Sequence, residues 1–457
     1  MKIPSVFTDQ VRNEYFELLK FETVGADPQK LRDCVQCAMW IKNWLAPAGF
    51  TGELLQAPNL LGTPPVLFAT RPGTPGALTI LFYGHYDVQP ADPLEEWQTP
   101  PFEPTLKDDG RIYCRGSQDD KGQWFSCLCG VRKFLAARKE GEPMPTIKIV
   151  LEGQEESGST ALAALAPTMK DKLRADVMLV CDTGAAADLR PAIIAGLRGV
   201  SHFTVRLTAA DHDLHSGEFG GIAPNPAQGM AEMLASLHNP DGSIAVKGFC
   251  DGIELPTDEE RDAAEAAAMS DERYEQEMGC PPVGGEQGLS ATERNSFRPT
   301  IEINGIHTGY GGPGSKTVIP AGALAKLSMR LVPGQNPATV MDCVVRHLER
   351  HTPRGMKLIV EDLSGEAPGF RLPLASPVFR LAKFVLEDMD PRGPVFQWDG
   401  ASIPVVSVLK AASGAAPLLV GWGQPQDRIH SPNESYGLDQ FAKSMEWGEK
   451  IMTALCD

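Results

Sequence analysis

Several histidine and carboxylate residues of this chain have types and spacings that suit divalent metal ions. Imidazole and carboxylate groups together bind ions such as Zn²⁺ and Mn²⁺, and one carboxylate can bridge two ions about 3.5–4 Å apart. Adjacent glutamates point different ways, so one can bind a metal ion while its neighbour stays free as a general base. The candidate residues are His85, Asp87, Asp119, Asp120, Glu155, Glu156, Asp182 and His430.

These candidates follow the strands that the hydrophobic pattern predicts. Continuous apolar runs at 77–84, 146–153, 175–182 and 416–423 read as strands, and helical stretches separate them. This pattern indicates an α/β domain whose mostly parallel sheet is covered by helices. Sites in such sheets form beyond the carboxyl ends of the strands. Each candidate alone could equally cap a helix or fill a turn, and only their convergence at one edge favours a site.

The pattern of apolar and polar residues changes near Gly196, which indicates a second domain. The stretches 199–210 and 326–334 alternate apolar and polar residues, and 227–239 and 338–351 read as amphipathic helices. Two strand–helix units with one solvated sheet face predict a smaller α+β domain inserted into the first. The predicted division is a catalytic domain of residues 1–197 and 372–457 and an inserted domain of residues 198–371.

Composition limits the classes of partner and the compartment. The 457 residues carry a formal net charge of −17, which disfavours nucleic acid and anionic membranes as partners. No apolar run approaches the roughly 20 residues that span a bilayer, and residues 1–20 contain no apolar signal region, so we expect a cytoplasmic protein. Ten cysteines do not make a disulfide scaffold, and the pair Cys34 and Cys37 has no second pair to complete a zinc site. The acidic stretch 254–279 is predicted to be a solvated surface insertion.

One glycine-rich stretch imitates a nucleotide-binding motif. GYGGPG (309–314) fits the pattern G-x-G-x-x-G, but it does not join a predicted strand to a predicted helix. We therefore expect no nucleotide site there and interpret the glycines as a flexible loop near the substrate.

Seven motifs occur in order along residues 84–435: GHYDVQP, CRGSQDDKG, EGQEESGS, HSGEFGG, GSKTVIP, SMRLVPG and RIHSPNES. Together they closely resemble the motifs of the dinuclear metallopeptidases. That family contains carnosine dipeptidases, aminoacylases, glutamate carboxypeptidases and succinyl-diaminopimelate desuccinylases, and the resemblance is greatest to the cytosolic nonspecific dipeptidases of the carnosine-dipeptidase branch.

The resemblance implies a zinc-peptidase-like catalytic domain with two Zn or Mn ions per chain. Asp119 would bridge the ions, Glu155 would be the general base, and Asp87 would orient His85. The implied ligands are His85, Asp119 and Asp182 for one ion, and Asp119, Glu156 and His430 for the other.

The inserted domain would then act as a lid that also forms a homodimer. By resemblance, His215 reaches into the partner subunit's site and stabilises the oxyanion. Arg330 would grip the substrate's carboxylate as a bidentate fork, with Thr317 and Ser402 helping to hold that end. Without the resemblance, Arg330 would be interpreted as an exposed strand residue.

The predicted activity is hydrolysis of dipeptides. A metal-bridged hydroxide would attack the peptide carbonyl, and Glu155 would pass its proton to the leaving amine. Alternatives with the same site are a carboxypeptidase, an N-acyl amino-acid deacylase and a desuccinylase; a non-catalytic binding protein would be expected to have lost a ligand or the base. The segment CDTGAAADLRPAI after Cys181 differs from the aromatic version in mammalian dipeptidases, so the substrate preference could differ.

Overall fold

The protein is described here from a computed structural model that covers residues 3–139, 141–400 and 402–456. The chain forms two compact units, which we call unit 1 and unit 2. Unit 1 comprises Met1–Ala195, Leu372–Gln397 and Val408–Asp457, and unit 2 comprises Gly196–Arg371 and Trp398–Ser407.

The segment Trp398–Ser407 differs from the domain division that we drew from the sequence. We had placed it in the catalytic domain with the rest of the C-terminal part, whereas it groups with unit 2. Polar contacts within unit 2 account for this grouping. The Arg198 guanidinium donates from Nε to the Gly400 carbonyl at 2.9 Å, and the Ser402 hydroxyl donates to the Arg198 carbonyl.

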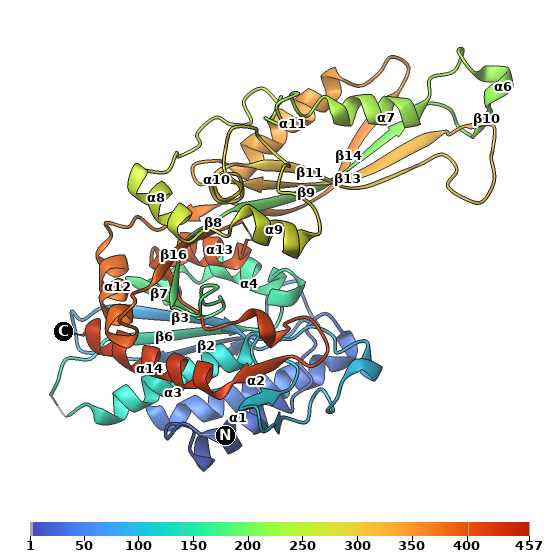
Figure 1. The fold of residues 1–457 in the computed structure, drawn as a ribbon. Coiled ribbons are helices and arrows are strands. Elements are labelled where there is room, and N and C mark those ends of the chain that lie inside the picture. Colours follow the sequence, from blue (N-terminus) through green and yellow to red (C-terminus); the bar gives the residue numbers. More distant parts are fainter. Residues whose placement is uncertain (1–2, 140, 401, 457) are drawn as a thin grey trace. The chain divides into compact units, whose positions relative to one another are not determined.

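The sheet of unit 1 has a parallel centre and antiparallel flanks (Figure 1). Its central strands run in the spatial order β6-β3-β7-β17 and pair in parallel. They are almost wholly buried, which is why they read as continuous apolar runs. The parallel centre confirms the predicted fold class. The centre consists of β3 (Thr79–His85), β6 (Thr146–Glu152), β7 (Val177–Val180) and β17 (Ala416–Leu419), and the flanks include β1 (Thr51–Leu55), β2 (Val66–Arg71), β8 (Ala192–Leu197) and β16 (Val395–Asp399).

Helices cover this sheet, and one helical stretch is broken. A 3-10 turn, Ala166–Thr168, divides the stretch 159–173. Pro167 explains the break, because proline inside a helix removes a backbone donor and clashes with the preceding turn. The helices are α1 (Asp9–Leu19), α2 (Leu31–Leu45), α3 (Lys121–Ala137), α4 (Thr160–Leu165), α5 (Lys170–Leu173), α12 (Pro377–Met389) and α14 (Leu438–Ala454), while α13 (Pro404–Ser413) begins in unit 2 and ends in unit 1.

Helix α3 fixes the position of Asp119, because it begins two residues later. It packs closely on α14: a Cβ added at Gly130 would lie 2.0 Å from the Met445 carbonyl oxygen, so only glycine fits there. At its first residue, the buried Lys121 ammonium donates to the Phe21 carbonyl at 2.8 Å. These contacts hold the start of α3 and the loop before it.

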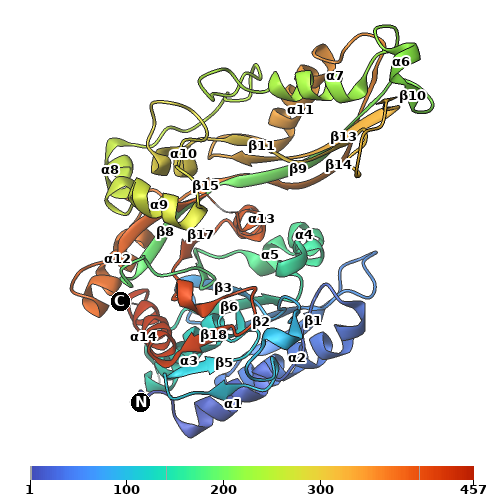
Figure 2. The ribbon, with the colours of Figure 1, turned by 45° about the vertical axis from the view of Figure 1, so that its right-hand side comes forward.

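Unit 2 contains a four-stranded antiparallel sheet in the order β11-β13-β9-β14 (Figure 2). Buried residues of the strands and of two helices form one hydrophobic core, which includes Val205, Met230 and Val344. This is the predicted α+β arrangement. The elements are β9 (Gly199–Thr208), β11 (Thr300–Thr308), β13 (Gly322–Leu331), β14 (Lys357–Ala367), α7 (Pro226–Ala235) and α11 (Pro337–Arg350), with a small pair formed by β10 (Leu214–His215) and β12 (Val318–Ile319) beside α6 (Ser216–Phe219).

The acidic stretch 254–279 forms α8 (Asp258–Ala266) and α9 (Asp271–Met278). No residue of α9 is buried, as predicted for a solvated insertion. In α8, however, Glu260 is buried and pairs with Arg371 at 3.3 Å. The remaining elements are α10 (Ala291–Phe297), β4 (Thr105–Leu106), β5 (Arg111–Tyr113), β15 (Phe370–Arg371) and β18 (Ser435–Gly437).

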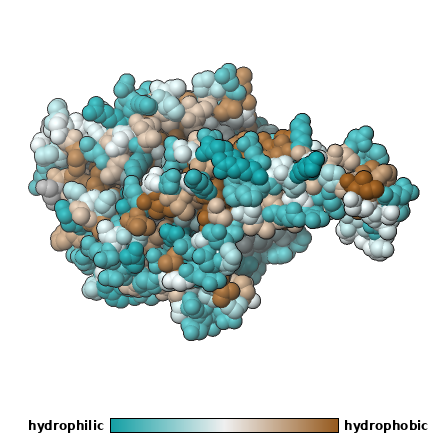
Figure 3. Space-filling view, turned by 90° about the horizontal axis from the view of Figure 1, so that it is seen from above, coloured by the Kyte–Doolittle hydropathy of each residue, from teal (hydrophilic) through white to brown (hydrophobic). Residues whose placement is uncertain are grey.

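The surface of the protein mixes hydrophobic and hydrophilic residues. Figure 3 shows hydrophobic residues in small patches among hydrophilic ones on the face that it draws. Within the described residues, we find no helix with the length and hydrophobicity needed to cross a bilayer.

Candidate metal centre

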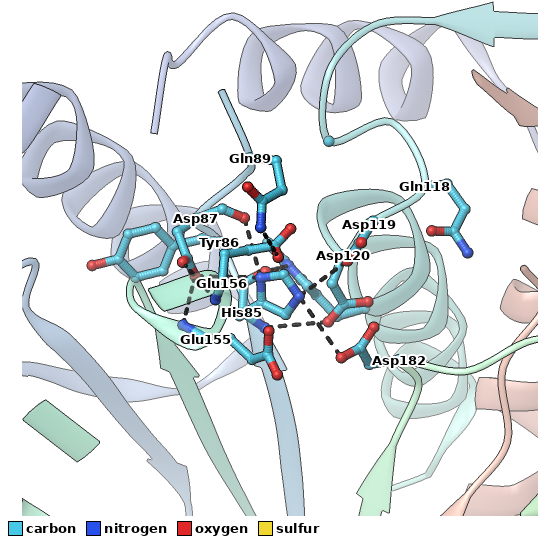
Figure 4. Close-up of polar contacts among 12 residues, drawn as sticks. His85, Tyr86, Asp87, Gln89, Gln118, Asp119, Asp120, Glu155, Glu156 and Asp182 are labelled. Atoms are coloured by element: carbon cyan, nitrogen blue, oxygen red, sulfur yellow. Dashed lines mark hydrogen bonds and ion pairs between the residues drawn. The ribbon is translucent and has the colours of Figure 1, made fainter. Parts of the chain in front are cut away.

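The parallel register brings the candidate ligands to one edge of the unit 1 sheet. His85 is the last residue of β3 and pairs with Glu152, the last residue of β6. The 3-10 turn Glu155–Ser157 follows β6, and Asp182 lies two residues beyond β7. Because β3, β6 and β7 are parallel, their carboxyl ends meet at this edge, as expected for sites in α/β sheets. Figure 4 shows the side chains gathered there.

Two groups of possible metal ligands lie within this cluster and share one residue. The first group is His85, Asp119 and Asp182, and the second is Asp119, Glu156 and His430; in each group the ligand atoms lie within 4.8 Å of one another. Asp119 presents Oδ1 to His85 Nε2 at 3.2 Å and Oδ2 to His430 Nε2 at 2.9 Å. One carboxylate oxygen facing each group is the arrangement of a bridging ligand.

The remaining acids of the two groups complete this geometry. Asp182 Oδ2 lies 3.7 Å from His85 Nε2, and Glu156 Oε1 lies 3.2 Å from His430 Nε2. Each group therefore offers one imidazole and two carboxylates. Mixed nitrogen and oxygen donors of this kind suit Zn²⁺ and Mn²⁺.

The electrostatics of the cluster also fit cations. Burial, and then the neighbouring Asp119 carboxylate, raises the pKa of Asp182 to about 7. Burial opposes ionisation of Asp119 as well, but hydrogen bonds with His430 and His85 hold its pKa below the usual range. Hydrogen bonds to Asp119 and Glu156 raise the pKa of His430 to about 10. Crowded buried carboxylates repel one another, and divalent cations would relieve that repulsion.

Glu155 lies beside the ligands without joining either group. Burial raises the pKa of its carboxyl group to about 8, and the Asp182 and Glu156 carboxylates add to this rise. Its backbone N–H donates to Asp87 Oδ1 at 3.2 Å, which fixes the turn that carries it. A carboxyl group with a pKa near neutrality is suited to accept and return a proton.

Asp87 holds two parts of the cluster together. Its Oδ1 lies 3.3 Å from His85 Nδ1, and its Oδ2 accepts the backbone N–H of Glu156 at 3.1 Å. The His85 Nδ1 atom also lies 3.1 Å from the Asp87 carbonyl oxygen. Asp87 therefore orients the imidazole and also the turn that bears Glu155 and Glu156, which the sequence did not indicate.

Glu434 is a buried residue beside the candidate ligands that the sequence did not single out. It is fully buried and accepts the backbone N–H groups of Gln118 at 2.9 Å and Asp119 at 3.1 Å, together with Arg115 Nη1 at 2.7 Å. Because it lies four residues beyond His430, it ties the His430 segment to the Asp119 loop. Its place in the motif RIHSPNES was the available signal.

Two more hydrogen bonds to the candidate ligands were not predicted from the sequence. Gln89 Nε2 donates to Glu156 Oε2 at 2.7 Å, and the His85 backbone N–H donates to Asp120 Oδ2 at 3.2 Å. Partners of this kind orient metal ligands. By contrast, Cys34 and Cys37 are buried on α2, and burial raises both thiol pKa values to about 12, so neither has thiolate character.

The predicted residues of unit 2 form two separate pairs. Thr317 Oγ1 lies 3.4 Å from His215 Nε2, and His215 Nδ1 accepts the Gly217 N–H at 3.0 Å. Arg330 Nη1 donates to the Ser402 hydroxyl oxygen at 2.9 Å.

Strand β13 sets the distance between these pairs. His215 pairs with Val318, close to the start of β13, while Arg330 is the penultimate residue of that strand. From Gly322 to Arg330 the strand rises roughly 26 Å at 3.3 Å per residue. The His215 pair and the Arg330 pair therefore lie near opposite ends of β13.

Comparisons with known proteins place this chain in a family. The model of Peptidase family M20/M25/M40 matches residues 81–454. The chain is 33% identical over 385 residues to human Beta-Ala-His dipeptidase, covering 82% of this chain and 74% of that protein. It is 30% identical over 394 residues to Cys-Gly metallodipeptidase dug1 of Schizosaccharomyces pombe, covering 84% and 81%.

A solved structure agrees with these relatives. The M20 family metallo-carboxypeptidase Sso-CP2 from Sulfolobus solfataricus matches with a TM-score of 0.82 and 26% identity, covering 98% of this chain and 100% of that one. The resemblance drawn from the seven motifs is thereby confirmed, and with it the expected class of enzyme. The chain belongs to Peptidase family M20/M25/M40.

Proposed function

We propose that this protein is a metal-dependent dipeptidase. The observation that carries the proposal is the pair of ligand groups that share Asp119, with the Glu155 carboxyl group beside them. Sequence relatives add support, because two of them are a Beta-Ala-His dipeptidase and a Cys-Gly metallodipeptidase.

In the proposed reaction, the residues of unit 1 hold two divalent ions and move one proton. The ligands would be His85, Asp119, Asp182, Glu156 and His430. Bound ions would lower the pKa of a water molecule and polarise the peptide carbonyl. Glu155 would take the proton from that water and deliver it to the leaving amine. Asp87 would keep His85 and the Glu155 turn in place throughout.

Unit 2 would supply groups for the rest of the substrate. Arg330 would bind the substrate carboxylate, with Ser402 holding its guanidinium, and His215, next to Thr317, would donate a hydrogen bond to the developing oxyanion. A dipeptide extends only about 7 Å, far less than the roughly 26 Å that β13 places between the two pairs. This mismatch supports a homodimer in which His215 serves the site of the partner subunit.

A carboxypeptidase acting on longer peptides is the second candidate. One observation favours it: the structural match to a metallo-carboxypeptidase over nearly the whole of both chains. Both candidates use the same metal site, so only the substrates distinguish them.

The ion and the compartment are further parts of the proposal. The donor set accepts zinc or manganese. No disulfide joins cysteines of the described residues, as is typical of proteins in the reducing cytoplasm.

The proposal is tested by hydrolysis of free dipeptides, N-acetyl amino acids and longer peptides. The protein is stripped with chelator and reloaded with Zn²⁺ or Mn²⁺, and bound metal is measured in the same samples. We expect metal-dependent cleavage mainly of dipeptides. Preferential release of C-terminal residues from longer peptides would favour the carboxypeptidase. Two bound ions per chain without cleavage of any of these substrates would contradict both.

A further inference from the structure

We propose that Arg428 and Gln118 form a subsite for a side-chain carboxylate of the substrate, so that the enzyme favours dipeptides containing aspartate or glutamate. The inference rests on the proposed function and deepens it. Both residues line a pocket of about 340 Å³ in unit 1, and Asp119 and Asp182 of the first ligand group line the same pocket. A group bound there would lie beside the proposed metal centre.

The Arg428 guanidinium brings a positive charge to the pocket and has no acidic partner among the described residues. The residue is exposed, and its guanidinium makes no hydrogen bond or ion pair with any described residue, although its backbone carbonyl accepts the Ser431 N–H at 3.1 Å. The neighbouring carboxylate cannot neutralise it, because Asp427 is buried and engaged elsewhere. Asp427 Oδ1 accepts from Arg111, and its Oδ2 accepts from Gln440 at 2.8 Å and from the Gln424 N–H at 2.7 Å.

The backbone at Arg428 is also unusual. Its φ of 57° lies in the left-handed region, which favours glycine or asparagine over a long side chain. This conformation is strained for a residue with a side chain, and such positions cluster at ligand sites. A surface arginine with no role would gain nothing from this position.

Gln118 is the second, independent observation. The residue is only 5% exposed, and its side-chain amide makes no hydrogen bond with any described residue; no dashed line reaches that amide in Figure 4. The amide atoms are not enclosed by protein but face the pocket, where a ligand or water can pair with them. A Cβ at Gly423 would lie 2.2 Å from Gln118 Nε2, so the glycine makes room for the amide at the pocket wall.

The shape and charge of the pocket fit a small acidic side chain. Three small residues, Gly184, Ala185 and Gly423, line it and leave space. The guanidinium and the amide can both donate hydrogen bonds to one carboxylate, and arginine does so as a planar fork. The Asp119 and Asp182 carboxylates would be offset by the proposed ions.

The test compares isosteric substrates that differ in one charge. The metal-loaded wild type is assayed on Asp-Ala against Asn-Ala and on Ala-Asp against Ala-Asn. A charge-assisted hydrogen bond predicts that kcat/KM for the acidic member is about 10–100-fold higher at one of the two positions, mainly through KM. The position with the preference identifies which substrate residue enters the pocket.

Two variants of Arg428 then test its part. Arg428→Asn suits the left-handed backbone and should reduce the Asp/Asn ratio about tenfold or more. Arg428→Glu should shift preference toward Lys-Ala or Ala-Lys. The matched control is Arg354→Asn, which removes the same charge from an exposed turn of unit 2 and should keep the wild-type ratio.

Three results would overturn the inference. These are an Asp/Asn ratio near one in the wild type, a ratio that Arg428→Asn leaves intact, and an equal loss on acidic and neutral dipeptides, which would mean that Arg428 holds the main-chain carboxylate instead. If no dipeptide is cleaved, the proposed function fails separately. Calorimetric binding of free aspartate against asparagine to the wild type and to Arg428→Asn then decides the subsite alone.

Discussion

The proposed functional residues of unit 1 and unit 2 are held in different ways. In unit 1, Asp119 contacts two histidines, its loop is bound by the buried Glu434, and His85 is contacted by Asp87 and Asp182. In unit 2, His215 is exposed and has Thr317 and a local backbone N–H as partners, at 3.4 and 3.0 Å. The residues of unit 1 therefore have several partners from different segments, whereas His215 has partners only within its own ribbon.

The difference indicates which residues are already fixed within one chain. Buried ligands with several fixed partners are pre-organised, so unit 1 should bind metal ions with little rearrangement. His215 is exposed on a two-stranded ribbon, so in the proposed function it contacts substrate only when the ribbon packs against a partner subunit. The comparison therefore predicts large, local effects for substitutions in unit 1 and effects that depend on the partner subunit for His215.

The largest effect is expected from Asp119→Ala. Because Asp119 contributes to both ligand groups, its removal should abolish binding of both ions and reduce hydrolysis to background. Metal content per chain, measured after dialysis, checks this. Asp182→Ala should lose one ion and keep the other, and the exposed Asp108→Ala should keep both. Retention of two ions by Asp119→Ala would remove the bridging role.

The next effect is expected from Glu155→Gln. The amide cannot accept a proton, so kcat should fall by about 10²–10⁴-fold, while metal content and thermal stability stay close to wild type. Steady-state kinetics with metal analysis of the same sample checks both parts. The control Glu95→Gln alters an exposed glutamate and should be silent. Normal turnover in Glu155→Gln would exclude the proposed base.

His215→Gln tests the dependence on a partner. Glutamine keeps an amide donor but not the position of the imidazole N–H, so kcat should fall by about 10²–10³-fold with metal content unchanged. Mixing His215→Gln chains with Glu155→Gln chains would restore one intact site per hybrid dimer, or about a quarter of wild-type activity if subunits pair at random. No recovery in hybrids shown to have formed would place His215 in the site of its own chain.

The smallest of the four effects is expected from Glu434→Gln. The Gln118 and Asp119 N–H groups and the buried Arg115 would lose a charged acceptor. Metal affinity should fall by about 10–100-fold, as for other partners of metal ligands. Competition with a chelator measures this. Glu449→Gln, which removes a surface pair with Lys133, is the control, and equal affinities in both variants would deny Glu434 a positioning role.

Much of the fold and site could be predicted because the signals are local. The buried strands read as apolar runs, and the strand ends carry His85 and Asp182. Contacts between distant segments could not be predicted in the same way. Asp87 binds the turn of Glu155 and Glu156 some 68 residues later, and Glu434 binds a loop more than 300 residues earlier. Neither contact leaves a periodic or spacing pattern in the sequence.

By itself, the sequence determined the chemistry available to this protein. Side-chain type and period-2 or apolar patterning depend only on the order of residues, so the parallel sheet, a second domain and the candidate ligands could be predicted from them. Only the tertiary structure decided which atoms meet. It turned one oxygen of Asp119 toward each histidine and separated His215 from Arg330 along β13. It also left the Arg428 guanidinium and the Gln118 amide at a pocket without partners among the described residues. The reason is physical: distances between side chains far apart in the chain are set by packing and register, which no short stretch of sequence contains.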